Sequence, residues 1–332
     1  MAPQVSEFTP AWFARGPHLQ TIWGRIVRPR RLAKLRRETI ETPDGDELVL
    51  DHLDGDASIR FLLLHGLEGS SNSVYMQGLL AAIARHGFAA TAINFRSCAL
   101  DECGRVLMNR RPRFYHSGET GDFDFVARLL AAREPSTRRV AVGASLGGNV
   151  LLKWLGENPG QQLIAAAAAF SVPFDLGAGA RHISRLYVVR FLRTLKKKIV
   201  QMLERFPAMR DRVDLAATLR SRTFEEFDAA ATAPIHGFAS ADDYYTRSSS
   251  LQFLARITTP TLVLNAEDDP FLPREALERA RAAASPVIDF RTTPCGGHTG
   301  FISGTFPWRC EYWAEETIVE WLAERRRLDG WQ

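Results

Sequence analysis

Residues 143–147 read Gly-Ala-Ser-Leu-Gly, which places a serine inside a tight turn between two glycines. An apolar stretch at 139–144 runs directly into this turn, and a helical pattern at 146–156 runs directly out of it. In this strand-turn-helix context a GxSxG motif holds a serine hydroxyl clear of the backbone as a nucleophile. We therefore predict that Ser145 is a catalytic nucleophile. The alternative is a glycine-rich turn with a serine at the helix N-cap.

A serine hydroxyl is a weak nucleophile at neutral pH, so it needs a base, and the base needs an orienting acid. Asp269 follows the predicted strand 261–266, and the proline after it restricts its backbone to extended angles. Asp268 is the competing acid, and a solvated acidic turn is the alternative for both. His298 follows two glycines in the loop after the last predicted strand, and we predict that it is the base. The order serine, aspartate, histidine is one of the known orders for such a triad.

Attack on an acyl group also requires hydrogen-bond donors for the oxyanion that forms. One predicted donor is the backbone amide of Leu146, the residue after the serine. The other is expected in the loop after strand 60–64, at Leu67, in the segment that begins with His65. Losing one such donor typically raises the barrier by about 2.7 to 4 kcal/mol.

Short apolar runs alternate with helical patterns along most of the chain. Strands are predicted at 35–42, 47–53, 60–66, 89–95, 139–144, 163–170, 261–266 and 287–293, and helices at 74–85, 119–132, 146–156, 273–284 and 312–327. Such alternation favours a parallel sheet that is covered by helices on both faces. We therefore expect an α/β fold with a mostly parallel central sheet flanked by helices.

The interval 171–251 breaks this alternation and mixes basic with apolar residues in helical segments. We predict that it is a helical cap inserted over the carboxyl edge of the sheet, where open α/β sheets bind ligands. One basic amphipathic helix is expected at about 181–206. The predicted organisation is a basic arm at 1–34, a core formed by 35–170 and 252–332, and the cap at 171–251.

The charge is distributed unevenly. The chain holds 42 Lys and Arg against 38 Asp and Glu, a net charge of +4. Residues 1–37 hold eight basic residues and one acidic residue, and residues 181–222 hold twelve basic and three acidic ones. These segments could contact an anionic membrane peripherally, or dock on the acidic remainder of the chain, which we favour because the insert is also apolar. We predict no nucleic-acid partner, because no binding motif accompanies the charge.

Several other classes find no support in the sequence. The longest apolar run, 163–170, has eight residues, whereas a membrane span needs about 18 to 20. The N-terminus carries no secretory signal pattern, so a cytoplasmic location is expected. HExxH, GxGxxG and Walker motifs are absent, so we predict no metal and no cofactor. The four cysteines form no CxxC pair and are interpreted as reduced thiols: Cys98, Cys103, Cys295 and Cys310.

Taken together, these motifs resemble the YheT-like branch of the α/β-hydrolase fold over most of the chain. The resemblance is carried by GPHLQTIWGR (16–25), PDGDELVLD (43–51), LLLHGLEGSSNSVY (62–75), NFRSC (94–98), YHSGET (115–120), VGASLGGNVLLKWLGE (142–157), TAPIHGF (232–238), DDYY (242–245), AEDDPF (266–271) and GGHTGF (296–301). It implies a serine hydrolase with esterase activity and places the triad on Ser145, Asp269 and His298. It also implies that His65 shapes the oxyanion loop. The family tends to have glycine after NFR, where this chain has Ser97, a departure that concerns the neighbouring loop rather than the chemistry.

The resemblance further implies carboxylesterase activity in bacterial members and action on glycerolipids or medium-chain phospholipids in eukaryotic relatives. We predict an ester hydrolase that acts through an acyl-enzyme on a short- to medium-chain acyl ester or a lipid-like ester. An acyltransferase that uses the same acyl-enzyme is one alternative. A non-catalytic ligand-binding protein is another, because a fold does not fix a function.

Overall fold

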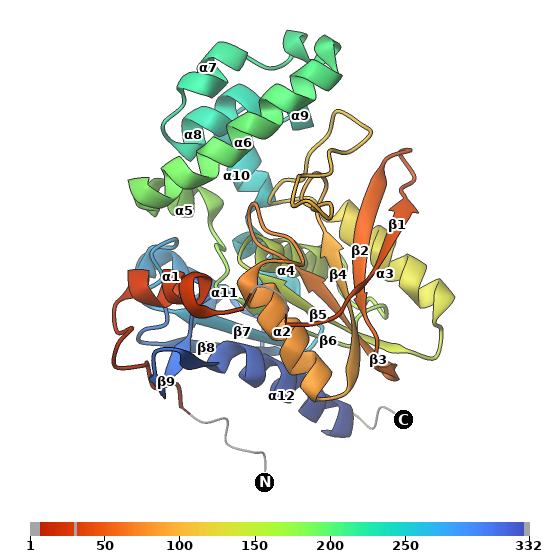
Figure 1. Cartoon of the computed structure of the whole chain (residues 1–332), viewed down its shortest axis with the longest axis vertical. Coiled ribbons are helices and arrows are strands. Elements are labelled where there is room, and N and C mark those ends of the chain that lie inside the picture. Colours follow the sequence, from red (N-terminus) through yellow and green to blue (C-terminus); the bar gives the residue numbers. More distant parts are fainter. Residues whose placement is uncertain (1–6, 30–31, 329–332) are drawn as a thin grey trace.

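The computed structural model describes residues 7–29 and 32–328, and its centre is an eight-stranded sheet (Figure 1). In spatial order the strands are β1 (Arg36–Glu41), β2 (Glu47–Leu53), β4 (Phe88–Asn94), β3 (Asp56–Leu64), β5 (Arg138–Ala144), β6 (Ala166–Phe170), β7 (Thr261–Ala266) and β8 (Ile288–Thr293). The strands from β4 to β8 in this order pair in parallel, and β1 and β2 pair antiparallel at one edge. The predicted, mostly parallel α/β sheet is confirmed.

Helices cover both faces of this sheet (Figure 1). Successive residues of a strand point to opposite faces, and on β3 Leu62 and Leu64 join one apolar core whereas Phe61 and Leu63 join the other. The first core is closed by α3 (Gly121–Arg133), α4 (Leu146–Glu157) and α11 (Arg274–Ala283), and the second by α2 (Val74–Arg85) and α12 (Trp313–Leu328). Burial on both faces explains why the central strands read as continuous apolar runs.

The N-terminal segment forms a helix that the sequence analysis did not predict, α1 (Pro17–Val27). The buried Gln20 ties it to a hairpin of β9 (Ile302–Phe306) and β10 (Arg309–Tyr312), because its amide oxygen accepts the Ile302 N–H at 2.6 Å and its amide nitrogen donates to the Ile302 carbonyl at 3.0 Å. Of the predicted basic arm, residues 1–6 and 30–31 lie outside the described residues. The described part of the arm lies against the body of the molecule.

The segment between β6 and β7 consists of helices that pack above the carboxyl ends of the strands (Figure 1). We refer to α5 through α10 as the inserted helices. They are α5 (Leu176–His182), α6 (Arg185–Arg205), α7 (Leu215–Arg220), α8 (Phe224–Phe227), α9 (Ala233–His236) and α10 (Ala241–Ser248), with the short helices η1 (Pro207–Asp211) and η2 (Asp228–Thr232) among them and η3 (Ser250–Arg256) after them. Instead of one helix over 181–206, α5 ends at His182 and α6 begins at Arg185, because Ile183 and Ser184 take backbone angles outside the helical region.

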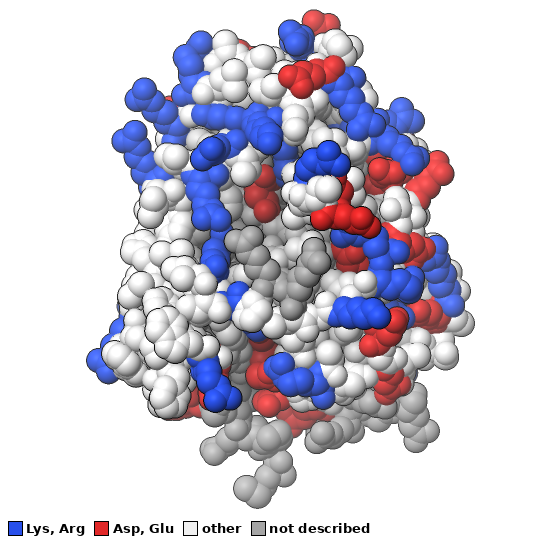
Figure 2. Space-filling model, in the orientation of Figure 1, with Lys and Arg blue, Asp and Glu red and all other residues white. Residues whose placement is uncertain are grey.

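Basic side chains gather over the inserted helices on the face shown in Figure 2. Among the basic residues of α6, the buried Lys198 pairs with Glu68 of the loop after β3, and Arg205 donates to the Met108 carbonyl at 2.9 Å. Others on α6, such as Arg185, form no ion pair with any described residue. Some of the basic residues of α6 therefore hold this helix against the rest of the protein. Across residues 7–29 and 32–328 there is no helix with the length and apolar character to cross a bilayer.

Candidate active site

Ser145 lies at the turn between β5 and α4, in a backbone conformation that side chains rarely adopt, with φ +53° and ψ −122°. Its N–H donates to the Phe170 carbonyl of the neighbouring strand at 2.9 Å. A Cβ atom at Gly143 would lie 2.5 Å from the Gly147 carbonyl oxygen, so the close return of the chain requires glycine there. The strained turn points the serine side chain away from the sheet.

The structure brings the three predicted triad residues together, although they lie on three different loops. Ser145 Oγ lies 2.9 Å from His298 Nε2. The other ring nitrogen, Nδ1, lies 2.9 Å from Asp269 Oδ2 and 3.1 Å from Oδ1. All three residues are buried, with exposed fractions of 9% for Ser145, 6% for His298 and 3% for Asp269. Because a carboxylate only accepts hydrogen bonds, this arrangement puts the proton on Nδ1 and leaves Nε2 to accept from the serine hydroxyl.

Asp268, the competing acid, makes a different contact. Its Oδ1 accepts the Gly297 N–H at 2.9 Å, in the loop that carries His298, and its carboxylate forms no hydrogen bond with the imidazole. Burial raises the pKa of Asp268, and the neighbouring charge of Asp269 raises it further. Asp269 instead holds its own carboxylate in place by accepting the Phe271 N–H at 2.9 Å. The two adjacent acids therefore fix the backbone of the histidine loop and the imidazole ring, respectively.

Neighbouring elements that the sequence analysis did not assign to the site hold the histidine loop. The His298 N–H donates to Thr21 Oγ1 of α1 at 2.9 Å, and the Thr299 N–H donates to Ser171 Oγ at 2.9 Å. The Phe271 ring stacks on the imidazole with centroids 3.9 Å apart. Thr21 and Phe271 lie within GPHLQTIWGR and AEDDPF, two of the segments that carry the family resemblance. Their place in these motifs could have indicated that both belong to the site.

The loop after β3 presents one unpaired amide between two paired ones. The Gly66 N–H donates to the Tyr75 hydroxyl and the Glu68 N–H to the Tyr115 hydroxyl, each at 2.7 Å. Within the described part of the chain, the amide N–H of Leu67 has no hydrogen-bond acceptor, and neither has that of Leu146. Both leucines line the same pocket as Ser145. The two amides named in the sequence analysis are thus available to a ligand.

His65 stabilises this loop through hydrogen bonds with backbone groups. It is fully buried, and burial lowers its pKa to about 4, so the ring is neutral at physiological pH. Its Nε2 accepts the Phe95 N–H at 3.0 Å, which leaves the proton on Nδ1 to be donated to the Gly66 carbonyl at 2.8 Å. With both nitrogens bound, His65 fixes the loop backbone in the described structure.

Glu68 connects the same loop to the inserted helices. Its backbone has φ +54°, and its Oε1 accepts from the Tyr115 hydroxyl at 3.0 Å and from Lys198 Nζ of α6 at 2.6 Å. The side chains of Glu68 and Lys198 are only 7% and 8% exposed. The loop is therefore linked to α6 by a buried ion pair.

Ser97 occupies the position where the resembling family tends to have glycine. Its φ of +57° lies in the left-handed region, which explains that preference. Asn109 accepts hydrogen bonds from both the Ser97 N–H and, at 3.2 Å, the Ser97 hydroxyl. The substitution therefore keeps the turn, with a neighbouring side chain that stabilises it.

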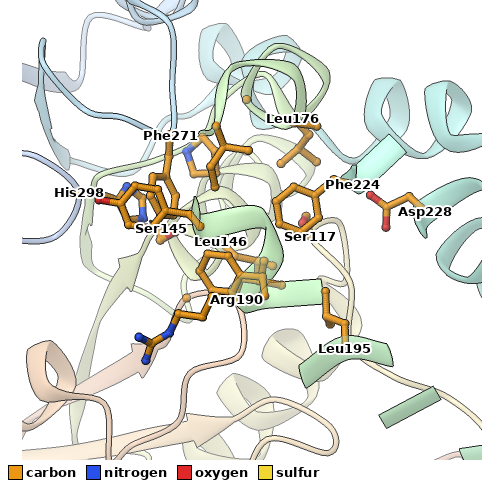
Figure 3. A pocket seen from close by; sticks show the side chains of 18 of the residues that line it. Ser117, Ser145, Leu146, Leu176, Arg190, Leu195, Phe224, Asp228, Phe271 and His298 are labelled. Carbon is orange, nitrogen blue, oxygen red and sulfur yellow. Dashed lines mark hydrogen bonds between the residues drawn. The ribbon is translucent and has the colours of Figure 1, made fainter. Parts of the chain in front are cut away.

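Ser145 and His298 open into a pocket beneath the inserted helices (Figure 3). Its walls near Ser145 come from the loops after β3 and β5, α1 contributes Thr21, Ile22 and Arg25, and the segment of the inserted helices contributes aromatic and aliphatic side chains that include Ile183, Phe191, Leu195, Phe224 and Phe227. Asp228 lies at the far side of the view from His298. It accepts from the Tyr245 hydroxyl at 2.7 Å and from Thr232, and burial raises its pKa to about 6.

Among the described residues, no group of three His, Cys, Asp or Glu side chains could hold a metal ion.

Comparison with known proteins assigns the family. A family model described as the alpha/beta hydrolase fold matches residues 59–305. The Escherichia coli protein YheT, named as an esterase, is 35% identical over 96% of this chain and 93% of its own length. This chain is a YheT-like α/β hydrolase. The hydrolase is also 30% identical to mouse phospholipase ABHD3, over 91% of this chain and 74% of that protein, and 29% identical to a yeast monoacylglycerol lipase, over 80% and 59%.

Solved structures agree with this fold. The Pyrococcus furiosus esterase Pf2001 superposes on the hydrolase with a TM-score of 0.53 over 99% of this chain and 97% of that one, at 14% identity. A Thermogutta terrifontis esterase gives a TM-score of 0.51 over 88% and 99%, at 19% identity. At these identities the likeness concerns the fold alone.

Proposed function

We propose that this hydrolase cleaves carboxylic esters through a covalent acyl-enzyme. Ser145 Oγ attacks the ester carbonyl while His298 Nε2 takes its proton. Collapse of the tetrahedral intermediate breaks the bond to the leaving alcohol, which receives that proton from His298. A water molecule, deprotonated by the same nitrogen, then attacks the acyl-enzyme and releases the acid. Asp269 keeps the imidazole in the required tautomer and stabilises its protonated form.

The amides of Leu146 and Leu67 are the proposed donors to the oxyanion. The proposal is supported by their lack of acceptors, while the amides on both sides of Leu67 are paired. Donors fixed in advance and shielded from water stabilise a developing charge without reorganising during the reaction. The positive end of α4 acts on the same charge.

The 2.9 Å contact between Ser145 Oγ and His298 Nε2, on the wall of a largely apolar pocket, is the observation that supports ester hydrolysis most directly. The named activities of the relatives, an esterase, a phospholipase and a monoacylglycerol lipase, point to the same bond type. We further propose that the segment 171–251 acts as a cap whose side chains select the substrate. A short- to medium-chain or lipid-like acyl ester suits the aromatic and aliphatic lining.

Labelling with a fluorophosphonate tests this proposal, because the reagent traps an activated serine. We expect the wild-type chain to be labelled and the Ser145→Ala variant, shown by circular dichroism to be folded, to remain unlabelled. A series of p-nitrophenyl esters of increasing chain length then gives the acyl preference. Folded wild-type protein that neither reacts with the probe nor cleaves any ester would support the ligand-binding alternative instead. Product analysis with an added alcohol separates hydrolysis from acyl transfer.

Contact with an anionic membrane and a cytoplasmic location both stay predictions. The contact is supported by α6, where Leu186 and Val189 are 72% and 57% exposed beside unpaired arginines. Because such binding combines charge attraction with apolar insertion, the protein should float with vesicles that contain anionic lipid at low salt and dissociate at high salt. Absence of flotation at both salt concentrations would contradict the membrane contact.

A further inference from the structure

Two arginines line the pocket of Ser145 without a counter-charge. Arg25 belongs to α1 and Arg190 to α6, so two segments far apart in the sequence each contribute one arginine to the lining of the same pocket, and both residues are exposed to solvent. Neither group forms an ion pair or a hydrogen bond with any residue that the structure describes. By contrast, Arg181 at the end of α5 pairs with Glu225 at 3.0 Å. Arg25 and Arg190 therefore differ from Arg181 in having no carboxylate partner among the described residues.

The two guanidinium groups also influence each other. Loss of hydration lowers the pKa of Arg25, and the positive charge of Arg190 lowers it further. Asp228 is the one acidic residue among the described residues that line the pocket, and Thr232 and Tyr245 already bind its carboxylate. A ligand that brought a negative charge between the arginines would relieve their repulsion.

The rest of the pocket is suited to a different part of the ligand. On α6, Leu195 follows Arg190 by five residues, about 7.5 Å along the helix axis. In Figure 3 the Arg190 guanidinium points away from Leu195, Phe224 and Asp228, which lie on the opposite side of the view. The pocket thus has a basic side and a mostly apolar side, where the Asp228 carboxylate is bound by Thr232 and Tyr245, and Ser145 and Leu146 lie on its wall. This polarity fits an amphiphile better than a neutral ester.

We propose that Arg25 and Arg190 form a subsite for an anionic group, a phosphate or a carboxylate, on the ester that Ser145 attacks. The inference rests on the proposed ester hydrolysis and narrows its substrate class to amphiphilic esters that carry a negative charge. Guanidinium groups suit this role because they stay charged and bind both anions with paired, charge-assisted hydrogen bonds. The apolar chain of the same substrate occupies the end formed by Leu195 and Phe224.

Matched ester pairs test the subsite. Octanoylglycerol is compared with octanoylglycerol phosphate, and octyl methyl succinate with octyl hydrogen succinate, so that each pair differs in one anionic group. We expect the wild-type protein to prefer the anionic member. Arg25→Gln and Arg190→Gln should each reduce this preference in kcat/KM about tenfold, as expected for a hydrogen bond to a charged group. The change should lie mainly in KM, because the subsite binds a part of the substrate that does not react.

Arg185→Gln is the matched control, because Arg185 is also an unpaired arginine on α6 but does not line the pocket. It removes the same charge, so an equal loss of preference in this variant would overturn the subsite in favour of a general effect of net charge. A preference that the two pocket variants leave unchanged would overturn it as well. Whichever pair responds identifies the anion as phosphate or carboxylate.

A binding measurement separates this inference from the proposed hydrolysis. Titration calorimetry of octyl phosphate, octanoate and octanol into the Ser145→Ala protein reports the subsite without turnover. We expect at least one anion to bind more tightly than octanol, and this advantage to disappear when Arg25 and Arg190 are both replaced by Gln. Arginine-dependent binding in a wild-type protein that cleaves none of the esters would refute the hydrolysis and not the subsite. Equal binding of all three ligands would refute the subsite.

Discussion

Replacing Ser145 or His298 by alanine should each lower kcat for the best ester substrate by on the order of 10⁶. The reason is their mutual dependence: without the imidazole the hydroxyl at 2.9 Å keeps its proton, and without the hydroxyl the imidazole has no nucleophile to activate. The double variant should therefore be hardly slower than either single variant. Steady-state kinetics on all three proteins, at equal concentrations of folded protein, provide the measurement.

Additive losses in the double variant would contradict this assignment, because independent residues multiply their effects whereas members of one unit do not. Some rate above the uncatalysed reaction should survive in every variant. The Leu146 and Leu67 amides are backbone groups and remain in place after these substitutions. Complete loss of rate together with an altered circular dichroism spectrum would indicate an unfolded protein, so the spectrum is recorded for each variant.

Asp269→Asn should reduce kcat by about 10⁴ while leaving the fold intact. An asparagine that turns its amide NH₂ toward Nδ1 donates where the carboxylate accepted, which favours the tautomer with the proton on Nε2 and blocks acceptance from the serine. The KM should change little, because the side chain lies behind the imidazole, away from the pocket lining. The kcat and KM of the variant, measured across a pH range, test this expectation.

Asp268→Asn provides the neighbouring control. Its contact is the Gly297 N–H, and an asparagine carbonyl oxygen can accept the same hydrogen bond. Activity should therefore fall only mildly. If Asp268→Asn were the severe variant and Asp269→Asn the mild one, the role of the acid would move by one residue and the observed contact with His298 would have no functional weight.

The sequence predicted the central architecture well because the buried strands and their helices follow simple periodicities. The strand predicted at 261–266 and the helix predicted at 74–85 coincide with β7 and α2. The geometry around Ser145, His298 and Asp269 could also be anticipated, because chain order and the carboxyl edge of a parallel sheet restrict where such residues meet.

Features that depend on distant contacts could not be predicted in this way. The helix α1 has no acidic first turn and no side-chain cap, and its place beside the histidine loop depends on Thr21 and on the buried Gln20. A Cβ atom at Gly297 would lie 2.4 Å from the Pro17 carbonyl oxygen, a close approach that nothing local in the sequence announces. The contribution of Arg25 and Arg190 to one pocket likewise follows from tertiary packing.

The buried bridge between Lys198 and Glu68 constrains how a bulky molecule reaches the nucleophile. Lifting α6 would separate Lys198 from Glu68, and leaving one charge of such a pair buried without its partner typically costs about 3 to 5 kcal/mol. Substrate is therefore expected to reach Ser145 without displacement of α6. If the inserted helices were exchanged between related enzymes, Glu68 and Lys198 would then have to be transferred together.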